Sequence, residues 1–132
     1  MKKSINRPCP CGSKKKYKHC CLLYHKGKIP ATPLELMKSR YSAYAFGEVS
    51  YILKTTHPDF RPQDLSNWKS EIGHFCKSDF QALTILSSGW NENEGFVEFE
   101  AHIDNYVLKE KSRFVKVEGR WYYTQGDVDV HQ

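Results

Sequence analysis

Four of the five cysteines in this 132-residue chain lie within one short segment near its start. Cys9, Cys11, Cys20 and Cys21 have the spacing C-x-C-x8-C-C, and Gly12 allows the backbone to reverse direction after the first pair. Zinc prefers a closed tetrahedral set of thiolate or imidazole ligands. In a cytosolic chain, such clustering favours a metal over disulfide bonds. The spacing therefore predicts one structural Zn²⁺ bound by these four thiolates.

The neighbouring pair Cys20 and Cys21 restricts how this site can form. Adjacent side chains point apart in an extended strand, so both sulfur atoms reach one ion only if the backbone is turned or helical there. His19 and His25 therefore stay open as alternative ligands. A segment this short buries almost no core, so we expect it to be disordered without zinc.

Positive charge is concentrated in the same segment. Residues 1–28 carry nine basic side chains and no acidic one, whereas the other 104 residues have a net charge of −4. Lys14, Lys15, Lys16 and Lys18, with Tyr17 among them, form a candidate partner-binding surface for something anionic. The alternative is a local role, in which these lysines lower the pKa of the nearby thiols and offset the charge of the thiolate site.

The cysteine-containing run resembles a known motif. The residues that carry the resemblance are Cys9-Pro10-Cys11-Gly12-Ser13, Lys15, Tyr17, Lys18, His19, Cys20 and Cys21. Together they are similar to the SEC-C motif, the zinc-binding tail of the translocase motor SecA. The resemblance implies zinc ligation by the four cysteines and docking on a protein or a ribosome, as SecA docks on the chaperone SecB and on ribosomes. Motor activity is excluded because the chain has no Walker A loop.

Residues 29–126 have the pattern of an α+β domain. Apolar residues at helical spacing predict an amphipathic helix over 34–46, followed by helices over 50–56 and, capped by Ser66, over 66–76. Alternation then predicts strands over 80–88, 96–103, 107–117 and 120–124, with Glu118-Gly119 as a hairpin turn. We expect the helices to pack on one face of a curved antiparallel sheet, and residues 127–132 to be a disordered tail.

This order of elements resembles the nuclear transport factor 2-like (NTF2-like, cystatin-like) cone. Three runs in particular resemble the YchJ-like family of bacterial proteins, which joins a SEC-C motif to such a domain: residues 37–44, residues 112–114 and residues 119–123. The resemblance implies a SEC-C module over residues 1–28 and an NTF2-like domain over residues 29–126. It implies no specific reaction.

Cones of this kind can use the space between helices and sheet as a pocket. The candidate pocket residues are Arg40, Tyr41, His57, Arg113 and Tyr122. Three of them also have a structural interpretation: Arg40 and Arg113 could each pair with a buried glutamate, and His57 could be a loop residue that ends a helix. Glu98, Glu100 and His102 alternate with apolar neighbours, which favours a solvated sheet face, and Cys76 is expected in the core. No nucleophile elbow, zinc-protease motif or phosphate-binding glycine loop is present, so nothing marks an enzyme.

Three functions are consistent with these features. The first is a non-enzymatic adaptor whose basic zinc module docks on a protein or ribosomal partner. The second is nucleic-acid binding through the lysines, with Tyr17 stacking on a base. The third is a small-molecule enzyme or ligand binder that uses the cone pocket. No apolar stretch suits a membrane span or a signal peptide, so we expect a soluble, cytoplasmic protein, and the oligomeric state stays open.

Overall fold

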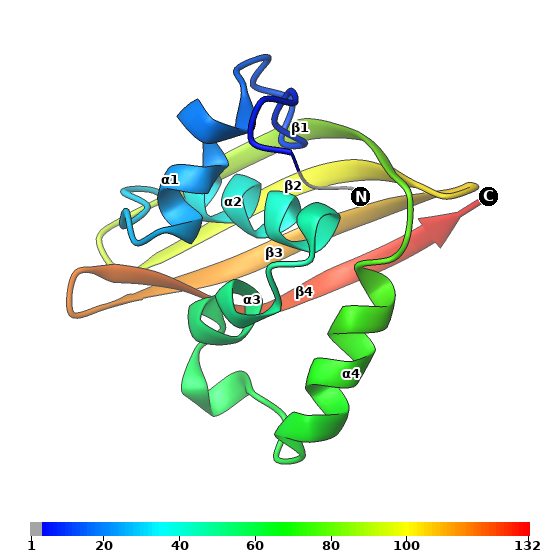
Figure 1. Cartoon of the computed structure of the whole chain (residues 1–132). Coiled ribbons are helices and arrows are strands. Elements are labelled where there is room, and N and C mark those ends of the chain that lie inside the picture. Colours follow the sequence, from blue (N-terminus) through cyan, green and yellow to red (C-terminus); the bar gives the residue numbers. More distant parts are fainter. Residues whose placement is uncertain (1–3) are drawn as a thin grey trace.

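The computed structural model of the chain describes residues 4–132. Helices come first and a four-stranded antiparallel sheet of order β1-β2-β3-β4 follows, which confirms the predicted α+β class (Figure 1). The elements are η1 (Tyr17–His19), α1 (Cys21–His25), α2 (Pro33–Phe46), α3 (Val49–Thr55), η2 (Pro58–Phe60), α4 (Leu65–Phe75), β1 (Phe80–Trp90), β2 (Glu94–Ile103), β3 (Tyr106–Val117) and β4 (Arg120–His131). Lys2 and Lys3, which contribute to the predicted basic charge, lie outside the described residues.

The central element is α2, which crosses one face of the sheet, here called the inner face (Figure 1). It begins after Thr32, whose hydroxyl accepts a hydrogen bond from the Glu35 amide at 3.1 Å, and it ends at Gly47 in the left-handed conformation. The predicted helix is confirmed, but it is not amphipathic. Ser39 and Ser42 are fully buried, because the cysteine-containing segment covers the face that the sequence pattern left to solvent.

The two following helices form close to the predicted positions. α4 is capped by Asp64 instead of Ser66, since the Asp64 carboxylate accepts a hydrogen bond from the Asn67 amide at 3.0 Å. Its last turn buries Cys76 beside Ile72, which confirms the expected core position of that cysteine. The domain core proper lies between α2 and the inner face of the sheet and is formed by Leu36, Met37, Tyr41, Val97, Phe99, Ala101, Ile103, Phe114 and Trp121.

The sheet follows the predicted alternation. Val97, Phe99 and Ala101 of β2 are buried, while His102 is exposed on the opposite, outer face. The turn between β3 and β4 has positive φ at Glu118 and Gly119, 50° and 81°, as a tight hairpin requires.

The C-terminus differs from the expectation. Residues 127–131 are not a disordered tail but continue β4, and they pair in register with β3 from Lys111 back to Val107. β3 is long, and its backbone amides and carbonyls need partners along its whole length. The extension of β4 provides them.

Candidate functional site

The first two cysteines lie on a small hairpin at the start of the chain. An isolated antiparallel bridge joins Pro8 to Lys16, and the Cys9 amide donates a hydrogen bond to the Lys15 carbonyl at 2.8 Å. The hairpin reverses at Gly12, whose φ of 86° favours glycine. Cys9 and Cys11 are thereby directed toward the same side.

The second pair comes from a break between two helices. The short helix η1 ends at His19, and α1 begins at Cys21. Cys20 between them has φ −132° and ψ −113°, which is neither helical nor extended. Because the backbone turns at Cys20, the sulfur atoms of the adjacent residues Cys20 and Cys21 can both face the hairpin instead of pointing apart as in an extended strand.

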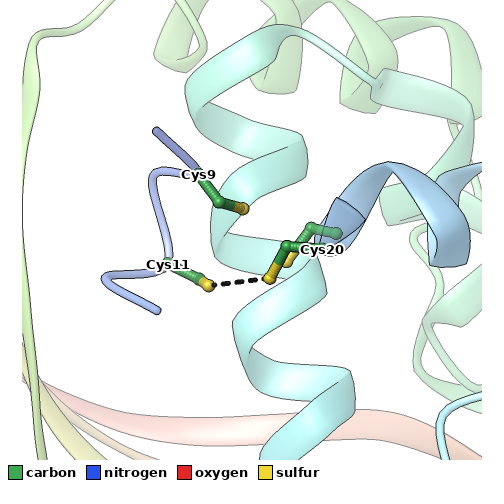
Figure 2. Close-up of side chains that lie close together, drawn as sticks. Cys9, Cys11 and Cys20 are labelled. Atoms are coloured by element: carbon green, nitrogen blue, oxygen red, sulfur yellow. Dashed lines mark hydrogen bonds between the residues drawn. The ribbon is translucent and has the colours of Figure 1, made fainter. Parts of the chain in front are cut away.

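The four sulfur atoms converge. The Sγ atoms of Cys9, Cys11, Cys20 and Cys21 all lie within 4.8 Å of one another, and those of Cys11 and Cys20 are 3.6 Å apart (Figure 2). Zinc–sulfur bonds of ~2.3 Å in a tetrahedron place sulfur atoms ~3.8 Å apart, so the spacing suits such an ion. Three of the four side chains are buried. The cluster could therefore bind a metal.

The electrostatics of the thiols point the same way. Hydrogen bonds from Cys11 and Cys21 hold the pKa of Cys9 well below its usual range. Hydrogen bonds with Cys11, the larger effect, and with Cys9 raise the pKa of Cys21 far above the usual range of a thiol. Thiols this close share one negative charge, because several thiolates repel each other. A bound divalent cation removes this conflict and allows all four to be thiolates.

The histidines considered as alternative ligands lie outside the cluster. The Nε2 atom of His25 donates to the Ser39 carbonyl at 2.8 Å, so its Nδ1 accepts from the Tyr17 hydroxyl. Both ring nitrogens are thus used in packing the module against α2. The His19 side chain is exposed. Cysteine at all four positions is the arrangement that the geometry favours.

The predicted partner-binding residues divide into two groups. Lys14, Lys15 and Lys16 are exposed, and Lys18 is half-buried. The Tyr17 side chain is fully buried and packs edge-on against the Phe46 ring with centroids 4.7 Å apart. The prediction that Tyr17 belongs to a contact surface is therefore wrong. The lysines before it are exposed, whereas the Tyr17 side chain points into the core.

A pocket of about 100 Å³ lies between α2 and the inner face of the sheet. Two of the predicted pocket residues, Arg40 and Tyr41, line it. Arg40 is buried, and none of the ion pairs among residues 4–132 joins it to a glutamate. Its Nη1 atom donates to the hydroxyls of Thr55 and Thr56, at 2.7 and 3.2 Å, and to the Ile52 carbonyl at 3.1 Å.

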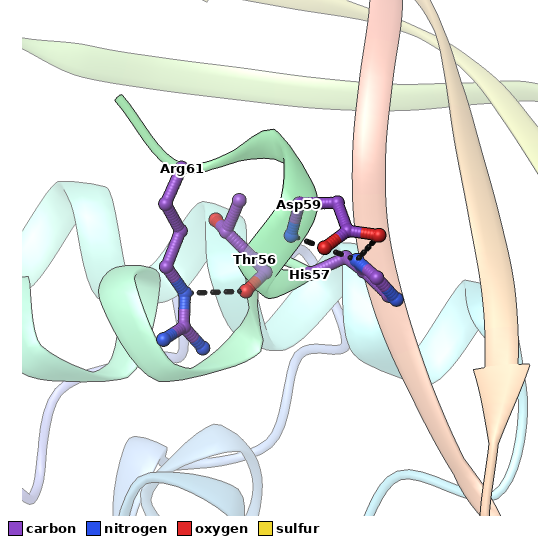
Figure 3. Close-up of polar contacts among 4 residues, drawn as sticks. All are labelled: Thr56, His57, Asp59 and Arg61. Atoms are coloured by element: carbon purple, nitrogen blue, oxygen red, sulfur yellow. Dashed lines mark hydrogen bonds and ion pairs between the residues drawn. The ribbon is translucent and has the colours of Figure 1, made fainter. Parts of the chain in front are cut away.

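The other three predicted pocket residues lie elsewhere. His57 precedes η2, where its Nδ1 accepts from the Asp59 amide at 3.1 Å, and the neighbouring Arg61 donates to the Thr56 carbonyl (Figure 3). Tyr122 packs edge-on against the His57 ring, outside the pocket. Arg113 is half-exposed and pairs with Asp127 at 3.3 Å, not with a buried glutamate. Strand alternation places Arg113 and Tyr122 on the side of β3 and β4 that faces away from the pocket, and His57 lies in the loop before η2.

The pocket contains four polar residues that the sequence reasoning missed: Tyr44, Glu110, Ser112 and Tyr123. Glu110 lies on β3 at two-residue spacing from Leu108 and Ser112, and all three line the pocket. Strand alternation could have revealed this glutamate, because its neighbours on the same face are apolar or small.

Comparisons with known proteins agree with this architecture. Residues 6–23 match the SEC-C motif, and residues 32–126 match the family described as the middle NTF2-like domain of YchJ. The chain is therefore an NTF2-like protein with an N-terminal SEC-C motif. A UPF0225 protein of Vibrio vulnificus (strain CMCP6) is 42% identical over 125 residues, which cover 89% of this chain and 73% of that protein. The chain belongs to this uncharacterised family.

Two solved structures are similar over most of the chain. The solution structure of a SEC-C motif containing protein from Rhodopseudomonas palustris has a TM-score of 0.78 and 36% identity, covering 92% of this chain and 98% of that one. The crystal structure of a SEC-C motif containing protein from Psychrobacter arcticus has a TM-score of 0.74 and 25% identity, covering 92% and 82%. Among residues 4–132, no helix is both long and apolar enough to cross a bilayer.

Proposed function

We propose that this protein is a cytoplasmic, non-enzymatic adaptor whose SEC-C module, residues 1–28, binds one structural Zn²⁺ and docks on a protein or ribosomal partner. The convergence of four sulfur atoms carries the metal part of this proposal. Four thiolates fill a tetrahedral zinc site and leave no position for substrate or water, so the ion has a structural role. Residues 29–126 are the NTF2-like body on which the module is mounted.

The docking part rests on how the lysines are held. Lys14 adopts a positive φ of 71° in the tight loop between the cysteine pairs, and the Lys15 amide donates to the Ser13 hydroxyl at 3.2 Å. The exposed Lys14, Lys15 and Lys16 therefore project from a tight, hydrogen-bonded turn of the backbone. A fixed positive patch of this kind attracts an anionic surface with an affinity that falls as salt rises.

Burial of Tyr17 weighs against the nucleic-acid alternative. Stacking on aromatic side chains supplies much of the affinity for single strands, and the basic loop has no exposed aromatic residue between Lys14 and Lys18. We therefore favour an acidic protein surface, free or on a ribosome.

Metal content is the first test. We expect about one zinc per chain in the native protein, loss of the metal in Cys20→Ser/Cys21→Ser, and full retention in the matched control Cys76→Ser. Elemental analysis of the purified, folded proteins provides the measurement. Zinc retained after the double substitution would contradict the assigned ligands.

Docking is tested separately by affinity capture from bacterial lysate at low and high salt, with nuclease treatment as a further arm. We expect Lys14→Gln/Lys15→Gln/Lys16→Gln to keep its zinc but lose a discrete partner that the native chain retains at low salt. The control Lys69→Gln/Lys77→Gln/Lys109→Gln removes the same charge from exposed positions elsewhere. Equal capture by both triple variants would refute docking through the loop, and capture abolished by nuclease would favour nucleic acid.

A further inference from the structure

The pocket between α2 and the inner face of the sheet combines apolar walls with opposite charges. Its walls include the rings of Phe75, Phe80, Phe99 and Phe114. One water molecule needs roughly 10–15 Å³ of such space, so the pocket of about 100 Å³ has room for a ligand the size of one substituted ring. Arg40 and Glu110 both line it, and we call it the Arg40–Glu110 pocket.

Arg40 brings hydrogen-bond donors to this pocket. Its Nη1 atom donates to neutral oxygen atoms of Ile52, Thr55 and Thr56, and a further hydrogen bond joins the guanidinium to the Tyr44 hydroxyl. A guanidinium has five N–H donors on three nitrogens, so Nη2 and Nε retain donors beyond these bonds. The fixed Nη1 contacts hold the group in one orientation.

Glu110 brings an acceptor. Its Oε2 atom accepts from the Ser112 hydroxyl at 2.6 Å and from the Tyr123 hydroxyl at 3.3 Å, so Oε1 is not used by either bond. Gly126 lies opposite Ser112 on β4, and a Cβ atom there would overlap the Glu110 carboxylate. The glycine therefore leaves the space that the carboxylate occupies.

The two charges line the same pocket but do not form an ion pair with each other. None of the ion pairs formed within residues 4–132 includes Arg40 or Glu110. They are instead connected through Tyr123, whose ring centroid lies 4.4 Å from the Arg40 Cζ atom while its hydroxyl bonds Glu110. A buried cation and a half-buried anion that do not neutralise each other directly favour a ligand that contacts both.

We propose that the Arg40–Glu110 pocket binds a small cyclic molecule bearing a neutral amide or lactam group, with its carbonyl oxygen facing Arg40 and its N–H facing Glu110. The ring lies among the four phenylalanines. A carboxylate would be attracted by Arg40 but repelled by Glu110. A protonated amine would be attracted by Glu110 but repelled by Arg40. A zwitterion would lose the hydration of both of its charges in an apolar site.

The experiment is an NMR titration of the full chain with four ring compounds of similar size: benzamide, benzoate, benzylamine and toluene. We expect benzamide to bind saturably, with the largest amide shifts in α2 and β3, and the other three to bind at least about tenfold more weakly. Saturable binding with shifts confined to the outer face of the sheet would overturn the proposal, as would the absence of saturable benzamide binding. Tighter binding of benzoate or benzylamine would overturn the amide class.

Two variants test the role of Glu110 by different means. Glu110→Gln removes the charge, whereas Gly126→Ala displaces the carboxylate without changing any charge. We expect each to weaken benzamide binding about tenfold, while Glu100→Gln on the outer face leaves it unchanged. A variant whose NMR spectrum matches that of the native chain is folded. One folded variant of the two is enough to test the role of Glu110. Unchanged affinity in a folded variant of this pair would overturn the assignment of Glu110.

Discussion

At the scale of single residues, His25 joins the cysteine module to the central helix. Its two ring nitrogens bond the Tyr17 hydroxyl and the Ser39 carbonyl, and its ring packs against Tyr51 with centroids 4.7 Å apart. All of these partners are buried. A buried polar group that loses its partner costs more than an exposed one, so this junction makes the module sensitive to small changes.

Tyr17→Phe tests this junction. The substitution keeps the ring but removes the hydroxyl that His25 Nδ1 bonds, so we expect the free energy of unfolding to fall by about 1–3 kcal/mol. Urea denaturation of the zinc-loaded protein provides the measurement. Tyr122→Phe removes the hydroxyl of a half-buried tyrosine that lies outside this junction and should change the stability less. Equal losses in the two variants would contradict a special role for the Tyr17–His25 contact.

Buried tyrosines predict a loss of stability in alkali. Burial raises the pKa of Tyr41 to about 12, and burial likewise raises the pKa of Tyr51 to about 12. An unfolded tyrosine ionises near pH ~10, so above that pH the unfolded state loses protons that the folded state keeps. The stability is thus fully present below about pH 10 and falls as the pH rises toward the folded-state pKa.

The measurement is urea denaturation as a function of pH. Tyr41→Phe should make the decline above about pH 10 shallower than in the native chain, since one titrating group is gone. Tyr122→Phe, at a position outside the helix–sheet core, serves as the control. A native chain whose stability stays constant up to about pH 12 would contradict this prediction.

At the scale of elements, α2 contacts the cysteine module, the neighbouring helix α3 and the sheet. One side of it packs on the sheet through Met37 and Tyr41, and another meets the cysteine module, where the Cys9 sulfur lies 3.4 Å from the Ser42 hydroxyl. Its N-terminal cap should therefore affect the whole protein. Thr32→Ala is expected to cost about 1 kcal/mol of unfolding free energy, whereas Thr32→Ser keeps the capping oxygen and should cost less. Thermal unfolding compares the two, and equal losses would argue against the cap.

The end of β4 gives a second prediction at this scale. Deleting residues 127–132 removes the partners of Val107–Lys111 on β3 and also the Asp127 partner of Arg113. We expect the β3 amides that face β4 to exchange with solvent faster, while amides in α2 keep their protection. Hydrogen exchange followed by NMR is the measurement. Unchanged protection along β3 would show that the extension does not stabilise the sheet.

At the scale of the whole molecule, the cysteine module and the NTF2-like body share one structural unit. The module lies against α2 through the contacts of Cys9, Tyr17 and His25, and the Trp121 indole donates to the Ala31 carbonyl at 3.3 Å near the connecting segment. Stability that zinc supplies to the module should therefore extend to the body.

Removal of the metal tests this coupling. We expect a strong chelator to lower the melting temperature of the sheet and helices together, with a single transition, and added zinc to restore it. Circular dichroism reports the helices, and tryptophan fluorescence reports the surroundings of Trp68 in α4, Trp90 in β1 and Trp121 in β4. Cys76→Ser should respond to the chelator as the native chain does. A body that melts at the same temperature with and without metal would show that the two parts are independent.

The amino-acid sequence determined the cysteine set, the order of helices and strands and the β3–β4 turn, because spacing, periodicity and glycine placement act over a few neighbouring residues. The tertiary structure decided which face each element buries. Ser39 and Ser42 became core only because the module covers them, and Tyr17 turned inward. Glu110 came to line the same pocket as Arg40 from an element far along the chain. The extent of β4 likewise depended on the length of β3 beside it. Burial and pairing of this kind arise from contacts between distant segments, which local patterns do not encode.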